Sequence, residues 1–213
     1  MFTRLTSRLP VPDSGNVCCH FITCAMDKTQ AAGTAPAALR VPQINALSDE
    51  QFITIFGNVI EHCPLVAAAV VTSRPIHSLK HLHAEICSFI DELPIRGREG
   101  ILRSHPDLAG RAAMEGQLTE ESRQEQKSAG LGDLTAEERS KLKLLNTSYC
   151  LKFGFPFVIC ARMNKKVAIL QGLGVRLNHS AEEELLKGIE EVKKIALLRL
   201  KNLVTEDNMD SKV

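Results

Sequence analysis

The sequence predicts an all-α fold, a single-domain helical bundle with one short extended buried segment. Apolar residues recur at helical spacing through most of the chain. Several of these stretches open with a capping box, in which two side chains satisfy two backbone N–H groups at the helix start. Only one stretch is strand-like, and a lone strand cannot form a sheet. The 213 residues suit one domain and suffice to bury a core.

The helices of the N-terminal half are expected to be short and apolar. Ser48 and Gln51 form a capping box, and the apolar residues of 52–60 repeat at helical spacing until Pro64 ends the run. Two more apolar helices are expected, one over residues 65–72 and one, opened by Ser78, over residues 79–93.

The C-terminal half predicts longer helices and the extended segment. A polar helix is expected over residues 119–130, after a Gly-rich connection. Two helices opened by capping boxes follow, over residues 135–153 and 180–204. Between them, residues 155–159 read Phe-Pro-Phe-Val-Ile, which predicts an extended buried segment.

The two ends of the chain differ from the helical part. Residues 1–43 contain prolines and a Thr/Ala/Gly-rich run but no sustained periodicity, which predicts a disordered leader. An untargeted tail, or a natural start at Met26, is favoured over a mitochondrial presequence, although the first ten residues carry arginines and no acid. Residues 44–205 are the predicted helical domain, and residues 206–213 a flexible tail.

The composition argues against nucleic-acid and membrane partners. A net charge of +1 and 4% aromatic residues provide neither a basic field nor stacking platforms for nucleic acid. The longest apolar run, Leu65 to Val71, is far shorter than the roughly 20 residues that cross a bilayer.

The cysteines indicate a reducing compartment. There are seven, an odd number, and no C-x-x-C pair occurs. Cys63, Cys87 and Cys160 lie among apolar neighbours, as buried thiols do. We therefore expect neither a disulfide framework nor a zinc site built on paired thiolates.

Ser104-His105-Pro106-Asp107 interrupts the helical pattern and could carry chemistry. Because Pro106 disfavours the helical conformation in the residue before it, His105 is presented from an extended turn. A rigidly held imidazole, with an ordinary pKa of about 6.5, can act as acid or base near neutrality. The alternative is an ordinary turn in which the histidine is incidental.

Two further places could hold a polar ligand. Ser122, Glu125 and Gln126 follow the i, i+3, i+4 spacing and share one face of the polar helix, although a solvated helix face explains the same residues. Arg199 falls in the apolar stripe of the last helix, where a guanidinium must be paired or face a cavity. An anion site and an internal salt bridge remain open for it.

A metal site is not predicted. His77, His81 and His83 form an H-x-x-x-H-x-H cluster in which the first two have the spacing of metal ligands. Glu85 alone offers a matching partner, so a surface cluster is favoured.

Taken together, these places resemble a known family. His-Pro-Asp-Leu-Ala-Gly is followed by a Leu-Thr-x-x-Ser-x-x-Glu-Gln helix, by Phe-Gly-Phe-Pro-Phe-Val and by Glu-Val-x-x-Ile-x-x-x-Arg-Leu, at residues 105–110, 118–126, 153–158 and 191–200. The chain thus resembles the 2-oxo-4-hydroxy-4-carboxy-5-ureidoimidazoline (OHCU) decarboxylases of urate degradation over residues 44–204. The segment 63–67, followed by Arg74-Pro75, is similar to vertebrate members.

The resemblance implies a cofactor-independent carboxy-lyase that acts as a homodimer and uses no metal. It implies conversion of OHCU, formed downstream of urate oxidase and hydroxyisourate hydrolase, into (S)-allantoin and CO2, with functional coupling to those two enzymes. The implied catalytic residues are His105 and Glu125. From the chemistry of the reaction we expect Glu125 to orient His105 and to crowd the leaving carboxylate. The implied substrate-binding residues are Pro106, Ser122, Gln126, Phe155, Phe157, Val158, Ile159 and Arg199.

The alternative function is a catalytically silent helical domain that binds a protein partner through the Glu/Gln-rich helix.

For location, the chain ends in Ser211-Lys212-Val213, which differs from the peroxisomal Ser-Lys-Leu address in its last residue. A peroxisomal location is therefore expected, with the cytosol as the alternative.

Overall fold

The all-α prediction is confirmed by the computed structural model, which describes residues 38–205. Within this range none of the helices is long and apolar enough to cross a membrane. The described elements are β1 (Leu39–Arg40), α1 (Val41–Ala46), α2 (Asp49–Phe56), α3 (Pro64–Val70), η1 (Val71–Ser73), α4 (Leu79–Glu92), α5 (Ile95–Arg103), α6 (Arg111–Met114), α7 (Glu120–Ser128), η2 (Leu131–Asp133), α8 (Ala136–Phe153), η3 (Ala161–Met163), α9 (Lys166–Arg176), α10 (Ala181–Leu203) and β2 (Val204–Thr205), where η marks a 3₁₀ turn.

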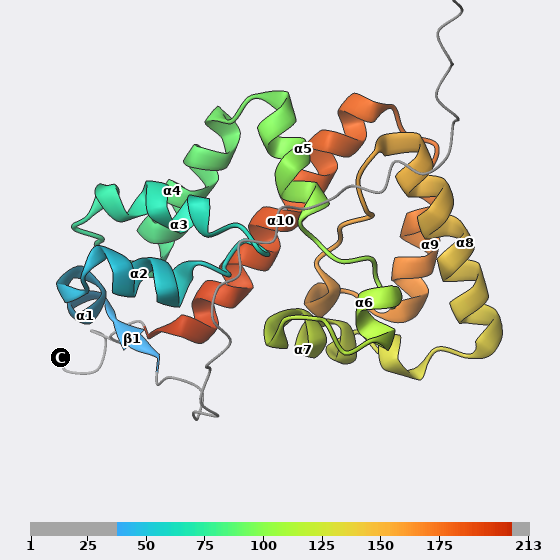
Figure 1. Ribbon diagram of the computed structural model, residues 1–213, viewed down its shortest axis with the longest axis horizontal. Coiled ribbons are helices and arrows are strands. Elements are labelled where there is room, and N and C mark those ends of the chain that lie inside the picture. Colours follow the sequence, from blue (N-terminus) through green and yellow to red (C-terminus); the bar gives the residue numbers. More distant parts are fainter. Residues whose placement is uncertain (1–37, 206–213) are drawn as a thin grey trace, which may run out of the picture. The chain divides into compact units, whose positions relative to one another are not determined.

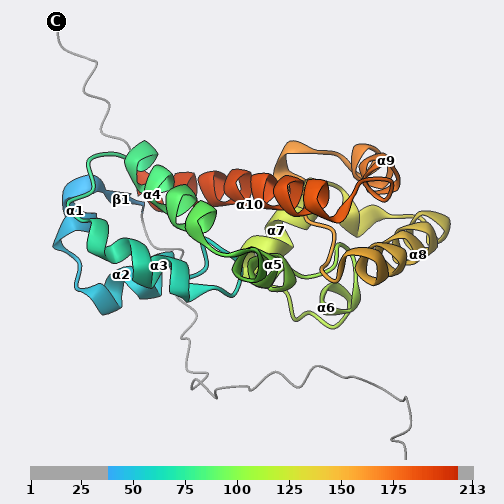
Figure 2. The same ribbon diagram turned by 90° about the horizontal axis from the view of Figure 1, so that it is seen from above.

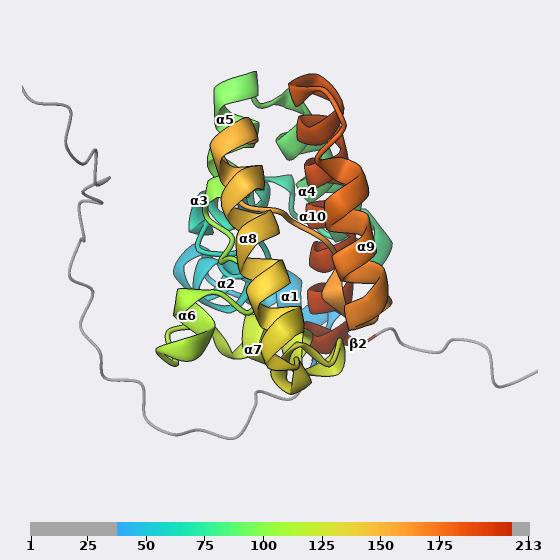
Figure 3. The same ribbon diagram turned by 90° about the vertical axis from the view of Figure 1, so that its right-hand side faces the viewer.

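Helix α10 is the central element around which the other helices pack. In Figures 1 and 2 it runs between the group α1–α4, at its C-terminal half, and the group α6–α9. Helices α4 and α5 pack directly on it, and α8 and α9 lie side by side, as Figure 3 shows. The two strands make one parallel pair, Leu39 opposite Val204, which ties the start of the described chain to the end of α10.

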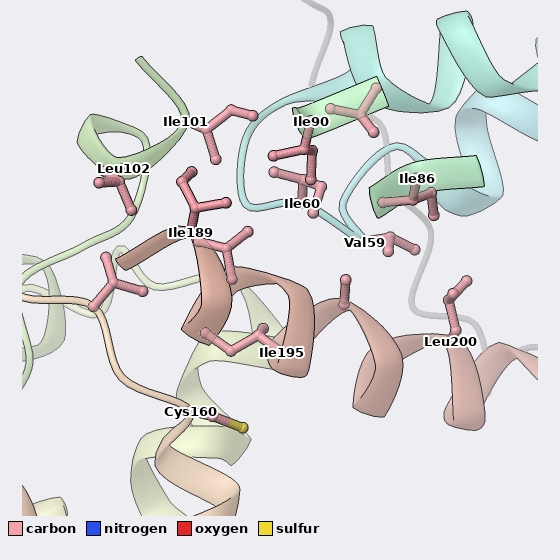
Figure 4. Packing of buried hydrophobic residues seen from close by; sticks show 14 of the residues in the cluster. Val59, Ile60, Ile86, Ile90, Ile101, Leu102, Cys160, Ile189, Ile195 and Leu200 are labelled. Atoms are coloured by element: carbon pink, nitrogen blue, oxygen red, sulfur yellow. The ribbon is translucent and has the colours of Figure 1, made fainter. Parts of the chain in front are cut away.

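The hydrophobic core lies against one stripe of α10. Ile189, Ile195 and Leu200 on this helix are buried, and Figure 4 shows Ile189 and Leu200 on the side of Val59 and Ile60, with Ile195 turned toward Cys160. The predicted 3.6-residue periodicity of the last helix therefore marks the face that it buries.

The first predicted helix ends earlier than expected, at Phe56 instead of Ile60. Val59, Ile60 and Glu61 are consecutive and all buried. A helix on the surface of a core cannot bury three neighbours in sequence, because successive side chains point 100° apart. The chain instead makes a turn in which His62 takes a φ of 49°, and this turn carries Glu61 into the interior.

Sequence patterns did not predict some of the helices and strands, and they placed the start of the folded domain too late, at residue 44. Helix α9 was not predicted, since no side chain caps its start and two glycines interrupt its pattern. Strand β1 and the first residues of α1 precede residue 44, where a disordered leader was expected. The rest of that leader, and the tail after residue 205, lie outside the described residues.

The extended segment follows α8 as predicted. Residues 155–160 have no helix or strand assignment, and most of their side chains are buried. Gly154 ends α8 with a φ of 75°, a left-handed conformation that glycine adopts without strain and that turns the chain into this segment. The segment then passes beneath α10, where Cys160 and Ile195 are both buried.

Candidate active site

A small cavity lies between α7, α10 and the extended segment. Its space is about 360 Å³ when the open mouth is included, but only about 30 Å³ of it admits the centre of a water molecule, so the cavity is narrow. The residues that line it come from four separate parts of the chain: His105, Pro106, Leu108, Ser122, Glu125, Gln126, Phe157, Val158, Ile159, Ala161, Ile195 and Arg199. The structure thus brings together all the predicted site residues except Phe155.

His105 follows the end of α5 and is fixed by the main chain. Its Nδ1 lies 2.9 Å from the carbonyl oxygen of Ile101, which can only accept, so Nδ1 carries a proton. Its Nε2 is buried and has no hydrogen-bond partner among residues 38–205. Burial lowers the pKa of His105 to about 4, so the ring is neutral near pH 7 and Nε2 offers a lone pair to the cavity.

Helix α7 presents its polar face to the interior. Ser122, Glu125 and Gln126 are all buried, so the solvated-face alternative is wrong, and their binding of a ligand stays a prediction. Gln126 Oε1 accepts the N–H of Ala109 at 2.9 Å, and Ala109 has a φ of 47°. A non-glycine residue in this left-handed region is strained, and such strain gathers at functional sites.

Arg199 is 2% exposed and joins α10 to α7. Its Nε and Nη2 donate to the two oxygens of Glu125, both at 2.8 Å, in the bidentate geometry that guanidinium and carboxylate groups favour. Its Nη1 donates to the carbonyl oxygen of Asn58 at 2.8 Å. Burial alone would lower the pKa of Arg199, but its acidic neighbours raise it above its ordinary value, so the guanidinium stays charged.

Sequence reasoning missed Glu61, which completes this polar cluster. Its carboxylate is fully buried and lies 2.6 Å from Arg199 Nη2. Burial alone would raise the pKa of Glu61, but the charge and hydrogen bond of Arg199 hold it below its ordinary value. The only local signal was an acid directly after the apolar run that ends at Ile60, and nothing nearby in sequence indicates its partners.

The extended segment forms the opposite wall of the cavity. Val158 C=O accepts from Arg176 Nη1 at 2.8 Å, and Cys160 N–H donates to Glu191 Oε2 at 2.9 Å. Between these two fixed points, the main-chain N–H and C=O of Ile159 have no partner among the described residues. They are available to a ligand.

Two predicted roles differ from the geometry. Phe155 packs with Tyr149 and Phe153 in a buried aromatic cluster and does not line the cavity. Glu125 was expected to orient His105, but its carboxylate pairs with Arg199, while the carbonyl of Ile101 orients the imidazole. The cause of both differences is long-range packing, which local spacing does not report.

The three histidines considered for a metal do not converge. His77 and His81 stack, whereas His83 Nε2 lies 2.9 Å from the carbonyl oxygen of Lys193 on α10. Among residues 38–205 no group of three His, Cys, Asp or Glu side chains could hold a metal ion.

The fold and cavity define a class of protein: an all-helical protein with a small-molecule site built for acid–base chemistry. A neutral histidine with a free Nε2 faces a cavity that also contains a carboxylate, an amide, a hydroxyl and a guanidinium. This combination can move a proton and hold a polar anion.

Comparison with known proteins places the chain in a family. The OHCU decarboxylase family model matches residues 45–201, so the chain belongs to this family. It is 52% identical to the 2-oxo-4-hydroxy-4-carboxy-5-ureidoimidazoline decarboxylase of Xenopus laevis, over 80% of this chain and 97% of that protein. It is also 52% identical to the protein of the same name from Amia calva, over 76% of this chain and 93% of the other.

A solved structure has the same fold. The crystal structure of (S)-allantoin synthase matches with a TM-score of 0.63 at 25% identity, over 78% of this chain and 54% of that chain.

Proposed function

We propose that the cavity around His105 is where this protein decarboxylates OHCU to (S)-allantoin and CO2 in urate degradation. The observation that supports this site best is the buried His105 Nε2, which has no partner in the described chain and faces the polar side chains of α7 and α10. The reaction makes the protein a carboxy-lyase of the OHCU decarboxylase family.

The substrate can accept its own electrons. When the bond to the carboxylate breaks, the electron pair forms a double bond between two ring carbons, and the adjacent C=N group takes the charge onto its nitrogen. A solvent proton neutralises that nitrogen. His105 Nε2 takes the proton of the substrate hydroxyl as that oxygen becomes a carbonyl, and then gives it to the neighbouring ring carbon. Delivery to one face sets the (S) configuration.

The other residues orient the substrate and control charge. Glu125 crowds the substrate carboxylate and favours its loss as neutral CO2. Gln126 has its oxygen occupied by the Ala109 N–H, so its NH2 group is free to donate to a ring or ureido oxygen. Pro106, Phe157 and Val158 form the apolar walls, and Ile159 offers its main-chain groups to the substrate. Arg199 and Ser122 complete the polar end of the cavity.

A coupled optical assay tests this function. Urate oxidase and hydroxyisourate hydrolase generate OHCU from urate, and circular dichroism follows (S)-allantoin with and without this protein. We expect a fast rise of the (S)-allantoin signal, and a loss of roughly 10²- to 10⁴-fold in His105→Asn, as is typical when an acid–base group is removed.

A surface histidine provides the control. His81→Asn changes a half-buried side chain paired with Glu85, away from the cavity, and should leave the rate unchanged. Turnover by His105→Asn at the parent rate would remove His105 from this role. Optically silent decay identical to the blank would instead favour the partner-binding helical domain.

We further propose a homodimer that is imported into peroxisomes. Exposed leucines on α8 and exposed valines on α9 give apolar surface to a second copy: Leu144, Leu151, Val167 and Val175. Sedimentation equilibrium would detect the dimer, and a monomeric mass at micromolar concentration would contradict it.

For import, the address Ser211-Lys212-Val213 lies outside the described residues. A protein tagged at its N-terminus should enter peroxisomes and remain cytosolic when these three residues are deleted.

Coupling to the two upstream enzymes is the remaining part of the proposal. Since OHCU is unstable, the enzyme should compete with its spontaneous decay. Adding this protein to the coupled reaction should raise the optical purity of the allantoin until the enzymatic reaction outruns the spontaneous decay, and further protein should then change it no more.

A further inference from the structure

We propose that Glu61 is a positioning residue for this reaction, which fixes Arg199 and makes Ser122 a hydrogen-bond acceptor toward the substrate. This inference rests on the proposed function of the cavity. Glu61 is absent from the cavity lining and lies behind it, in the turn between α2 and α3. It can therefore act on the substrate only through the side chains that it holds.

The contacts of Glu61 all point toward the site. Its Oε1 accepts the hydroxyl of Thr119 at 2.9 Å, and its Oε2 accepts the hydroxyl of Ser122 at 2.9 Å. The same Oε2 lies 2.6 Å from Arg199 Nη2. Thr119 is the N-cap of α7, so Glu61 also fixes the start of the helix that carries Ser122.

The number of available hydrogens decides whether Ser122 donates or accepts a hydrogen bond toward a ligand. An ionised carboxylate can only accept, so the single hydroxyl proton of Ser122 is donated to Glu61. Arg199 Nη2 has two hydrogens for three acceptors, so the Ser122 oxygen, at 3.2 Å, shares one of them with the nearer oxygens of Glu125 and Glu61 and accepts with one lone pair. The remaining lone pair can only accept, so Ser122 recognises an N–H or O–H of a ligand and not a carbonyl. The ring and ureido N–H groups of OHCU meet this requirement.

The charges show that Glu61 is more than a structural partner for Arg199. Glu125 alone would neutralise the guanidinium with ideal bidentate geometry. A second fully buried carboxylate leaves a net negative charge in the cluster, and uncompensated buried charge is costly. His62, directly after Glu61, is also strained at a φ of 49°. The cost at Glu61 and the strain at the residue after it indicate a functional requirement.

The net charge also acts on His105. Of the groups whose charge acts on its ring, Glu61 favours the protonated imidazole, whereas Arg199 and a protonated His62 disfavour it. Glu61 therefore stabilises the imidazolium that forms when His105 holds the substrate proton.

Two substitutions separate charge from shape. Glu61→Gln keeps the size of the side chain, but its NH2 group meets donors where the carboxylate oxygen accepted. Glu61→Asp keeps the charge and loses one methylene. If Glu61 only filled space, the Gln variant would be the better tolerated. We expect the reverse order, with kcat/KM reduced roughly 10- to 100-fold in Glu61→Gln, as for loss of a hydrogen bond to a charged group, and less in Glu61→Asp.

A double-variant cycle tests the route through Ser122. Ser122→Ala removes the acceptor that Glu61 positions, so adding Glu61→Gln to it should cost much less than Glu61→Gln costs alone. KM and kcat are measured separately in the coupled assay, and the folded fraction of each variant is checked by far-UV circular dichroism. Parent kinetics in Glu61→Gln, or effects of the two substitutions that multiply in full, would overturn the proposal. If Glu61→Gln does not fold, the same cycle is measured with Glu61→Asp.

A measurement without turnover distinguishes this proposal from the proposed function. The titration of His105 in the ligand-free protein, followed by NMR of its ring carbons, should move to lower pH in Glu61→Gln, whereas loss of packing alone would move it toward the ordinary value for histidine. An unchanged titration would contradict the charge effect of Glu61. An inactive parent protein that still shows the shift would refute the proposed reaction, whereas the charge effect of Glu61 on His105 would stand.

Discussion

The guanidinium of Arg176 on α9 holds the main-chain carbonyl of Val158 in the cavity wall, with Nη1 2.8 Å from the oxygen. Arg176 also pairs with the fully buried Glu184 of α10, with Nη2 and Oε2 2.9 Å apart, and Tyr149 donates its hydroxyl to the same carboxylate. Burial and Glu184 raise the pKa of Tyr149 well above its ordinary value, so the phenol stays protonated and serves as donor. A second ion-pair cluster, separate from the first, therefore supports the extended segment.

Arg176→Met should destabilise the protein and weaken catalysis together. Removing Arg176 leaves the buried Glu184 with only Tyr149 and His179 as partners, and breaking a buried ion pair typically costs about 3–5 kcal/mol. The loss of the bond to Val158 should also lower kcat/KM, because the cavity wall loses its anchor. Urea unfolding gives the free energy, and the coupled assay gives the rate at a temperature where the variant is folded.

An exposed arginine is the matched control for this change. Arg162→Met removes a guanidinium that donates to the Leu198 carbonyl at the surface, so unfolding should change by less than about 0.5 kcal/mol. Equal losses in the two variants would contradict the assignment of Arg176 as an anchor.

Glu191 anchors the other end of the same segment. Glu191→Ala leaves the buried N–H of Cys160 without an acceptor, which should cost about 1–3 kcal/mol. Glu191→Gln keeps an acceptor oxygen and should lose less. Hydrogen exchange of the Cys160 amide reports the anchor directly: we expect faster exchange in the Ala variant than in the Gln variant. Unchanged protection in Glu191→Ala would show that the bond does not hold the segment.

The burial of His105 should be visible in the pH dependence of stability. Its pKa in the folded protein, about 4, lies below the ordinary value of about 6.5, so the unfolded state binds more protons between these pH values. The contribution to stability is fully present above pH ~6.5 and is lost as the pH falls toward 4, by about 3 kcal/mol in total.

Comparison with His105→Asn isolates this contribution. The parent protein should lose about 2 kcal/mol more than the variant between pH 7 and pH 5 in urea unfolding, since the asparagine does not titrate. The apparent base pKa in kcat/KM of the parent should also lie near 4, so that activity stays flat down to about pH 5. Identical pH dependence of stability in the two proteins would mean that His105 is not desolvated.

Local chemistry explains which parts of the fold the sequence predicted. The capping boxes at Ser48, Thr135 and Ser180 each form between residues three apart, so the helix starts follow from neighbours in sequence. The shared face of Ser122 and Gln126 likewise follows from the helical period alone. The resemblance to a family then placed His105 and Arg199 in the same site, which no local pattern could do.

What the sequence did not predict depends on partners far away in the chain. Glu61 is buried because Ser122, 61 residues later, and Arg199 receive it. Helix α9 has no side-chain cap, and its Arg176 is fixed by Glu184 and by the Val158 carbonyl. Phe155 lies in the core because Tyr149 and neighbouring rings surround it. In each case packing, not spacing, decides the position.

Gly188 should be required for the approach of α5 to α10. A Cβ built there would lie 2.9 Å from Cδ2 of the fully buried Leu102, whose carbonyl accepts the N–H of His105 at 3.2 Å. Gly188→Ala therefore has to displace Leu102, which should cost about 1–3 kcal/mol and lower kcat by shifting His105.

Gly172→Ala in α9 makes the same change inside a helix with nothing within 4 Å of the new Cβ, and it should stabilise by about 0.5–1 kcal/mol. Since the intrinsic gain of alanine over glycine is common to both, the difference in unfolding free energy measures the close contact alone. Equal gains in stability would show that α5 does not rest on Gly188, and an unchanged kcat in a destabilised Gly188→Ala would show that His105 does not depend on this contact.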